Sequence, residues 1–234
     1  MEAKLFLEGL ALRLGRQAAQ IEPPSAPTRL PASYTAESRR LELAARFKRE
    51  LELVGGKVTY ARSRTDAQRA LTTEIQSWKA ERIVSWSLEE FKSWGLFDLL
   101  PRTSCMAFDP KVHVATSFAK LCAKAQLGIT TADFGIAQSG TLAIRASISR
   151  PRAVSLLPAV HVALLRESQL VDRLGGAFAA YRKQGALSAS NIHFITGPSR
   201  TSDIENDLAI GVHGPAVVAV ILWLDETEQA EAGA

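Results

Sequence analysis

The chain has 234 residues, a hydrophobic content of 47% and a formal net charge of +4. This length can bury a large core, and it favours one large domain with a small appendage. No apolar run in the sequence approaches the ~20 residues of a membrane-spanning helix, and no Lys/Arg run alternates with aromatic residues. We therefore expect neither a membrane nor a nucleic-acid partner. Because Glu2 and Glu8 interrupt any signal-peptide pattern, we expect a cytoplasmic protein.

Cysteine and histidine content limits the metal chemistry that this chain can support. Its two cysteines, Cys105 and Cys122, lie far apart and have no C-x-x-C partner. An iron–sulfur cluster or a zinc ribbon needs more thiolate ligands than that. The histidines are His113, His161, His193 and His213. They form no H-x-x-x-H pair with an acidic partner, so we predict no metal site and no cofactor, and we expect both thiols to pack in the core.

The two ends of the chain are predicted to lie outside the main domain. Residues 1–36 combine an amphipathic helix with a linker, which is rich in proline between positions 23 and 31. The apolar stripe of the helix consists of Ala3, Phe6, Leu10, Leu14 and Ala18. A lone helix of this length is marginal in water, so the stripe must bury against the main domain, a partner or a second copy, which leaves a homodimer open. Residues 225–234 are predicted to form a disordered acidic tail.

Residues 37–224 alternate between helical and strand patterns. We predict helices over 37–54, 66–79, 89–94, 118–127 and 170–184, and strands over 57–61, 82–86, 132–137, 141–146, 160–165, 192–195 and 217–223. The succession of strand, helix and strand from residue 57 to 86 is a βαβ unit, which requires parallel strands. The runs 160–165 and 217–223 are apolar throughout, as is typical of strands that helices cover on both faces. The sequence therefore predicts a three-layer α/β/α domain with a mostly parallel sheet.

The polar segment 197–215 is the first candidate binding site. It follows the apolar strand 192–195 and contains Ser199, Arg200, Thr201, Asp203 and His213. Ser202 and Glu205 have the spacing of a capping box, which predicts that a helix begins there. Loops between strand and helix at a sheet edge often hold anions, and the planar guanidinium of Arg200 suits a carboxylate or phosphate. The alternative is a capped turn with a solvent-facing arginine.

A second set of candidates lies between residues 133 and 161. Gln138, Ser139, Gly140 and Thr141 offer hydroxyls and a glycine that would let the backbone approach a ligand, although a hairpin turn explains the same residues. His161 lies in an apolar strand, where it is either buried and hydrogen-bonded or turned toward a ligand pocket. Asp133, among apolar neighbours, must be paired or exposed at an edge. Neither set identifies a catalytic residue.

Three ordered motifs of this sequence resemble those of the LUD-domain family, over roughly residues 45–224. They are residues 128–142 (GITTADFGIAQSGTL), 152–161 (RAVSLLPAVH) and 197–215 (GPSRTSDIENDLAIGVHGP). The resemblance implies the fold of ribose-5-phosphate isomerases, glucosamine-6-phosphate deaminases and CoA transferases. Gln138 stands where members of the family commonly have a glutamate, so an acid–base or acyl-carrying role is not expected at that position.

The resemblance also implies function. The best-known family members act in a three-component system that oxidises L-lactate to pyruvate and whose other components resemble iron–sulfur proteins. We therefore expect an accessory subunit, or one that binds a small carboxylate or phosphate, with iron–sulfur proteins as partners. The alternatives are an independent enzyme of the sugar-phosphate isomerase or CoA-transferase type, acting on a phosphorylated or acyl substrate, and a pure interaction protein.

Overall fold

The computed structural model describes residues 36–92, 94, 105–185, 191–204, 207–211 and 213–224. The predicted N-terminal helix and linker end where this description begins, and the predicted tail 225–234 follows its last residue. Both predictions therefore concern residues outside the described ones.

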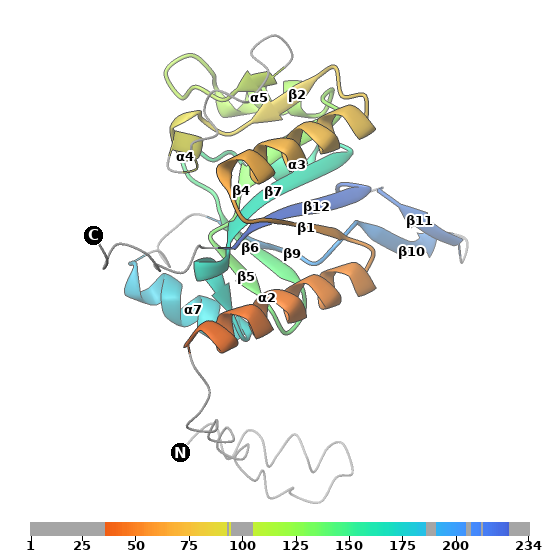
Figure 1. Ribbon diagram of the computed structural model, residues 1–234. Helices are drawn as coiled ribbons and strands as arrows, with labels where there is room; N and C mark the ends of the chain where they lie inside the picture. Colours follow the sequence, from red (N-terminus) through yellow and green to blue (C-terminus); the bar gives the residue numbers. More distant parts are fainter. Residues whose placement is uncertain are drawn as a thin grey trace, which may run out of the picture. The chain divides into compact units, whose positions relative to one another are not determined.

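A six-stranded parallel sheet forms the centre of the domain (Figure 1). In spatial order its strands are β1 (Lys57–Ala61), β12 (Val217–Trp223), β7 (Val160–Arg166), β4 (Leu127–Thr131), β2 (Ile83–Ser85) and β3 (Cys105–Ala107). In β7, the residues from Val160 to Leu165 are all buried. The α/β class with a mostly parallel sheet, predicted from the continuous apolar runs, is confirmed.

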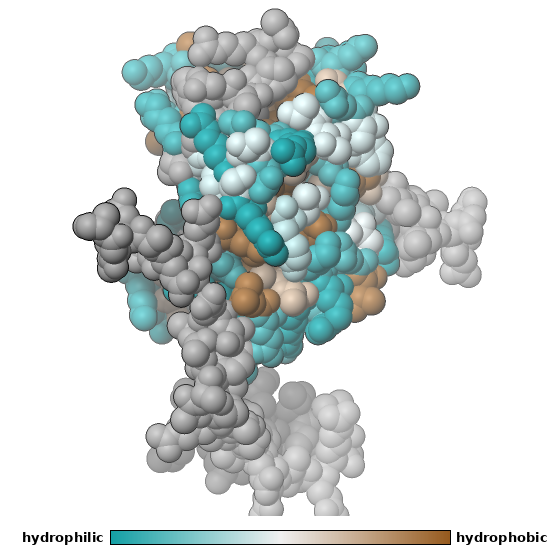
Figure 2. Space-filling model, in the orientation of Figure 1, coloured by the Kyte–Doolittle hydropathy of each residue, from teal (hydrophilic) through white to brown (hydrophobic). Residues whose placement is uncertain are grey.

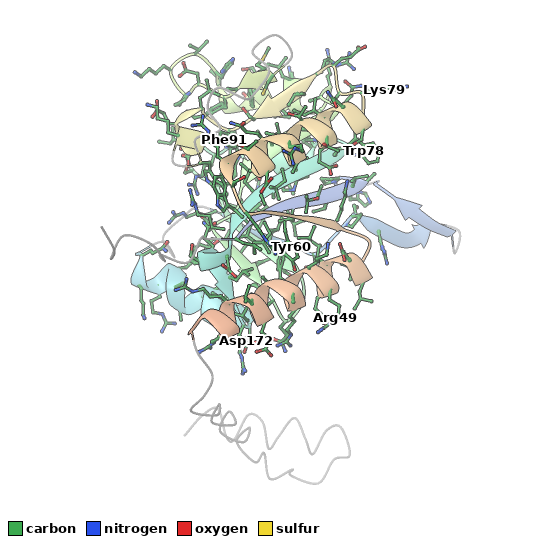
Figure 3. All side chains as sticks on the ribbon, in the orientation of Figure 1. Arg49, Tyr60, Trp78, Lys79, Phe91 and Asp172 are labelled. Carbon is green, nitrogen blue, oxygen red and sulfur yellow. The ribbon has the colours of Figure 1, made fainter. Side chains whose placement is uncertain are left out.

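Helices cover both faces of this sheet, and side-chain contacts of β1 identify the two faces. Lys57 Nζ lies 2.5 Å from Glu74 Oε1 of α3 (Arg64–Ser77), so α3 covers one face. Tyr60 points to the opposite face, since alternate residues of a strand do so. Its hydroxyl donates to the Ala44 carbonyl of α2 (Ala36–Leu53) at 3.3 Å, between β1 and α2 in Figure 3. The short helices α4 (Glu89–Lys92), α5 (Ala115–Cys122) and α6 (Ala153–Leu156) connect further strands.

A four-stranded sheet shares the α2 side of the domain, which the sequence did not predict. Its order is β8 (Leu170–Val171), β5 (Phe134–Ile136), β6 (Thr141–Arg145) and β9 (Ile192–Ile195). The predicted hairpin at residues 138–140 joins β5 to β6, which pair antiparallel. A Cβ on Gly135 would lie 2.5 Å from Leu165 Cδ2 of β7, so this glycine allows the two sheets to approach closely. One of the two covering layers is therefore partly β-structure.

Three predicted helices differ in the structure. The helix predicted over residues 118–127 spans Ala115–Cys122 (α5), because Leu127 begins β4, a strand that the sequence did not predict. The helix predicted from residue 170 begins at Leu174 (α7, Leu174–Lys183), because Leu170 and Val171 pair with β5 after a 3₁₀ turn (Glu167–Gln169). The helix predicted to begin near residue 202 is wrong. The segment instead forms β10 (Arg200–Ile204), antiparallel to β11 (Asp207–Ile210). This hairpin supplies the backbone hydrogen bonds that a helix would have provided, and it overrides the capping signal.

The strand order defines a topological switch point. From β1 the chain advances to β2 and β3, and it then returns through β4, β7 and β12. Because crossovers between parallel strands are right-handed, the connections after β2 and β4 leave the sheet on opposite faces. Open α/β sheets usually hold ligands at the carboxyl ends of such neighbouring strands. The switch point therefore lies where β2 and β4 end.

Candidate functional site

The hydroxyl side chains of the β5–β6 turn form a small network. Ser139 Oγ lies 2.7 Å from Thr141 Oγ1, which lies 2.8 Å from Thr196 Oγ1 at the end of β9. The backbone N–H of Gln138 donates to the Asp172 carbonyl at 2.9 Å. Gln138 and Ser139 are exposed, whereas Thr141 is buried. The turn thus presents the exposed Gln138 amide and Ser139 hydroxyl beside the buried Thr141 hydroxyl.

Gly140 serves a packing contact in this turn. Its φ is +61°, in the left-handed region that favours glycine, and an added Cβ would lie 2.2 Å from the Leu51 backbone nitrogen of α2. The close approach that the sequence suggested for a ligand is therefore an approach to the last turns of α2. This contact fixes the hairpin against the helix.

Arg200 also contacts the end of α2. Its Nη2 donates to the Val54 carbonyl at 2.7 Å, just beyond the last residue of the helix. The carbonyl end of a helix carries partial negative charge, so a guanidinium there stabilises the helix. Arg200 therefore has a structural partner, and its predicted role as an anion anchor stays a prediction.

The remaining candidates of the segment 197–215 lie around Ser199. The Ser199 N–H donates to the Pro215 carbonyl at 2.9 Å, and the Ser199 carbonyl accepts from the Gly211 N–H at 2.9 Å. His213 is exposed in this loop. Thr201 and Asp203 belong to the backbone of β10, and their side chains lie outside the described part.

The structure thus brings residues 138–141 and 199–200 to the end of α2. That end lies beside the start of β1, because only Val54, Gly55 and Gly56 separate the helix from Lys57. Parallel strands begin at this edge, so these candidates lie at the opposite edge from the switch point. His161 is not among the residues that contact this helix end.

His161 is buried in β7, with 0% exposure, and its Nε2 lies 2.8 Å from Thr130 Oγ1. Burial, and secondarily the nearby His193, lowers its pKa to about 3. His193 Nε2 lies 2.9 Å from Ser155 Oγ, whose hydroxyl donates to the Arg152 carbonyl at 3.1 Å. His193 must then donate through Nε2. Within the described residues, the Nδ1 atoms of His161 and His193 are both buried without a hydrogen-bond partner.

An ion-paired cluster at the switch point was not predicted. Arg150, in the loop after β6, lies 2.8 Å from Asp133 Oδ1 and 2.6 Å from Glu90 Oε2 of α4. Asp133, directly after β4, also accepts from the Arg145 backbone N–H at 2.6 Å and the Tyr181 hydroxyl at 3.1 Å. The expectation that Asp133 is paired is met. Glu90 and Arg150 were missed because they lie 60 residues apart, and no local motif links them.

Glu90 and Arg150 stabilise each other's charged forms. Burial raises the pKa of Glu90, but the hydrogen bonds from Arg150 and Ser149 outweigh it, so that this pKa is lowered overall. Burial likewise opposes the charge of Arg150, but the bonds to Glu90 and Asp133 raise its pKa. Burial and the neighbouring Asp133 raise the pKa of the Tyr181 hydroxyl. Tyr181 therefore remains a hydrogen-bond donor at neutral pH.

A shallow hollow between α2 and β1 combines apolar and charged groups. It is lined by Ala45, Lys48, Arg49, Glu52, Leu53 and Tyr60. Figure 2 shows apolar side chains interspersed with polar ones over α2 and β1, and Leu53 is 71% exposed. Lys48 Nζ donates to the Val58 carbonyl at 2.6 Å, on the outermost strand of the sheet. A lysine there blocks edge-to-edge strand pairing, which gives this surface a structural role.

None of the helices that the structure describes is long and apolar enough to cross a membrane. The described residues also include no group of three or more His, Cys, Asp or Glu side chains placed to hold a metal ion.

Comparisons with known proteins identify the family of this chain and a related fold. The family model described as "LUD domain" matches residues 44–223. Lactate utilization protein C of Exiguobacterium sp. is 39% identical over 109 residues, which cover 45% of this chain and 47% of the relative. Its namesake in Bacillus subtilis is 40% identical over 109 residues, 45% of each chain. The matched segments thus span less than half of these relatives. The crystal structure of a DUF162 family protein from Deinococcus radiodurans superposes with a TM-score of 0.59 at 18% identity, covering 79% of this chain and 98% of that one.

Proposed function

This chain belongs to the LUD domain family, and from that premise we propose that it is an accessory, small-anion-binding component of a system that oxidises L-lactate to pyruvate with iron–sulfur proteins. The observation that carries the proposal is the identity of about 40% to relatives named lactate utilization protein C. The proposed location is the cytoplasm, where L-lactate is used as a carbon source.

The chemistry of the cysteines supports a division of labour with iron–sulfur partners. Cys105 lies on β3 and Cys122 on α5, and burial raises the pKa of these thiols to about 11 and about 12. Thiolates are the form that ligates iron, and burial disfavours the thiolate form of both side chains. In this proposal the electrons pass through clusters on partner proteins, while the LUD domain binds a small carboxylate or phosphate.

Arginine side chains with hydroxyl neighbours support the anion-binding part. Arg200 lies near the Ser139–Thr141 hydroxyl network, at the end of α2. Arg150 lies beside the Ser149 hydroxyl at the switch point, since both contact Glu90. A planar guanidinium with a hydroxyl donor suits the oxygen atoms of carboxylates and phosphates.

Growth of a deletion strain tests this function. Removal of the gene for this chain from its host should abolish or strongly slow growth on L-lactate as the sole carbon source, with growth on glucose unchanged. A plasmid copy should restore it. Affinity purification of the tagged chain from lactate-grown cells should recover proteins that carry iron–sulfur clusters. Normal growth of the deletion strain on L-lactate would refute the proposal.

A further inference from the structure

The Glu90–Arg150 pair at the switch point has the geometry of a bound carboxylate. Arg150 directs Nε and Nη2 to the same carboxylate oxygen, Glu90 Oε2, at 2.7 Å and 2.6 Å. Ser149 Oγ donates to the other oxygen, Oε1, at 2.7 Å. We propose that Glu90 occupies a carboxylate-binding site formed by Arg150 and Ser149, and that a small monocarboxylate binds there by displacing it.

Arg150 stays in place when Glu90 leaves. Its guanidinium lies over the Trp86 ring, 5.2 Å from the centroid, and its Nη1 donates to Asp133 Oδ1 at 2.8 Å. Asp133 is itself held by the Arg145 backbone N–H and the Tyr181 hydroxyl. Because Trp86 and Asp133 already hold the guanidinium in position, Arg150 loses little side-chain entropy when an anion binds.

Glu90 is the partner that can leave. It belongs to the four-residue helix α4, and the described hydrogen bonds of its side chain are those from Ser149 and Arg150. Its side chain is 16% exposed and that of Arg150 is 21% exposed, so both side chains are partly open to solvent. Asp133, by contrast, is 10% exposed and accepts from three different residues. Exchange of Glu90 for a ligand carboxylate also leaves the charge around Arg150 unchanged.

The neighbouring groups indicate the ligand class. Ser149 supplies a hydroxyl next to the carboxylate position, and the positive charge of Arg145 acts on Glu90 from nearby. A small 2-hydroxy or 2-oxo monocarboxylate presents one carboxylate, whose two oxygens can take the places of Glu90 Oε2 at Arg150 and Glu90 Oε1 at Ser149. The choice of L-lactate and pyruvate within this class rests on the proposed function, whereas the position of the site rests on the geometry of Arg150.

Calorimetric titration with L-lactate and with pyruvate tests the site at constant ionic strength. Glu90→Gln removes the competing charge and keeps the side-chain size, so it should tighten binding of at least one of them about tenfold. Glu89→Gln is the matched control, because Glu89 lies on the same helix and pairs with Lys92 at the surface. It should bind as the native protein does. If Glu90→Gln fails to fold, Glu90→Asp replaces it, since the shorter side chain retracts from Arg150 and should also tighten binding.

Addition of Arg150→Lys to Glu90→Gln should return the affinity to the native value or below it, because lysine lacks the guanidinium fork. Folded Glu90 variants that bind no tighter than native, or a double variant that binds as Glu90→Gln does, would overturn the proposed site. The deletion strain separates this outcome from the fate of the proposed function. If growth on L-lactate requires this chain but the Glu90 variants bind L-lactate and pyruvate no more tightly, only the proposed site is refuted. Tighter binding with normal growth of the deletion strain refutes the proposed function only.

Discussion

Replacement of Gly140 by alanine should destabilise the domain strongly, although the residue lies in a surface turn. The new Cβ would lie 2.2 Å from Leu51 N and 2.5 Å from Leu51 Cα, both backbone atoms of α2, which cannot rotate away. Overpacking of this kind costs about 1–3 kcal/mol. A non-glycine residue at a φ of +61° adds about 1–2 kcal/mol. The free energy of unfolding should therefore fall by about 2–5 kcal/mol.

Thermal unfolding followed by circular dichroism measures this loss. A domain of this size loses about 2–4 °C in Tm for each kcal/mol, so Gly140→Ala should lower the Tm by about 5–20 °C. Gly175→Ala is the matched control, because Gly175 lies in α7 and an added Cβ there meets no atom within 4 Å. That change should leave the Tm unchanged or raise it slightly, since alanine favours a helix.

A Gly140→Ala variant with the same Tm as the native protein would refute this prediction. A variant of native stability that had lost affinity for L-lactate or inorganic phosphate would show that Gly140 serves a ligand, as the sequence also allowed. Equal losses in Gly140→Ala and Gly175→Ala would show that the contact with α2 does not decide the effect.

Two further predictions concern Arg200 and His161. Arg200→Ala should lower the free energy of unfolding in urea by about 1 kcal/mol, through loss of the bond to the Val54 carbonyl. If Arg200 also anchors an anion, calorimetry on Arg200→Ala should show carboxylate or phosphate binding weakened by ~1.5–3 kcal/mol. Unchanged binding would show that Arg200 only stabilises the end of α2. The pKa of His161 is about 3 in the folded protein, against about 6.5 when unfolded, so only the unfolded state gains this proton between those values. The free energy of unfolding should therefore fall by at most about 1.4 kcal/mol per pH unit as the pH drops below 6.5. In His161→Gln the urea midpoint should change less between pH 6.5 and 5 than it does in the native protein. If the midpoint changes equally in both, other groups such as His193 cause the loss of stability.

Local sequence patterns determined the framework of this protein. The strands at residues 57–61, 192–195 and 217–223 have the bounds that the sequence predicted. The continuous apolar character of residues 160–165 predicted a strand buried on both faces, and Leu164 and Leu165, which point to opposite faces, are both fully buried. The turn at residues 138–140 followed from a glycine between two strand patterns. Each of these features is encoded by residues that are neighbours in sequence, so periodicity and turn chemistry suffice to read them.

Partners from distant parts of the chain decided the rest. The helix predicted from residue 170 begins only at Leu174, because Leu170 and Val171 pair with β5. The segment from Arg200 became a strand because residues 207–210 pair with it.

The functional groups depend on the same distant contacts. The sequence singled out Arg200 as a cation but could not show the Val54 carbonyl, which lies 146 positions earlier in the chain. It gave no sign that Arg150 meets Glu90 and Asp133, which come from two strand ends that are adjacent only in the folded sheet. The sequence shows which side chains are charged, but the topology of the fold determines which group lies opposite each charge. The identity of that partner determines whether the charge stabilises the fold or remains available to a ligand.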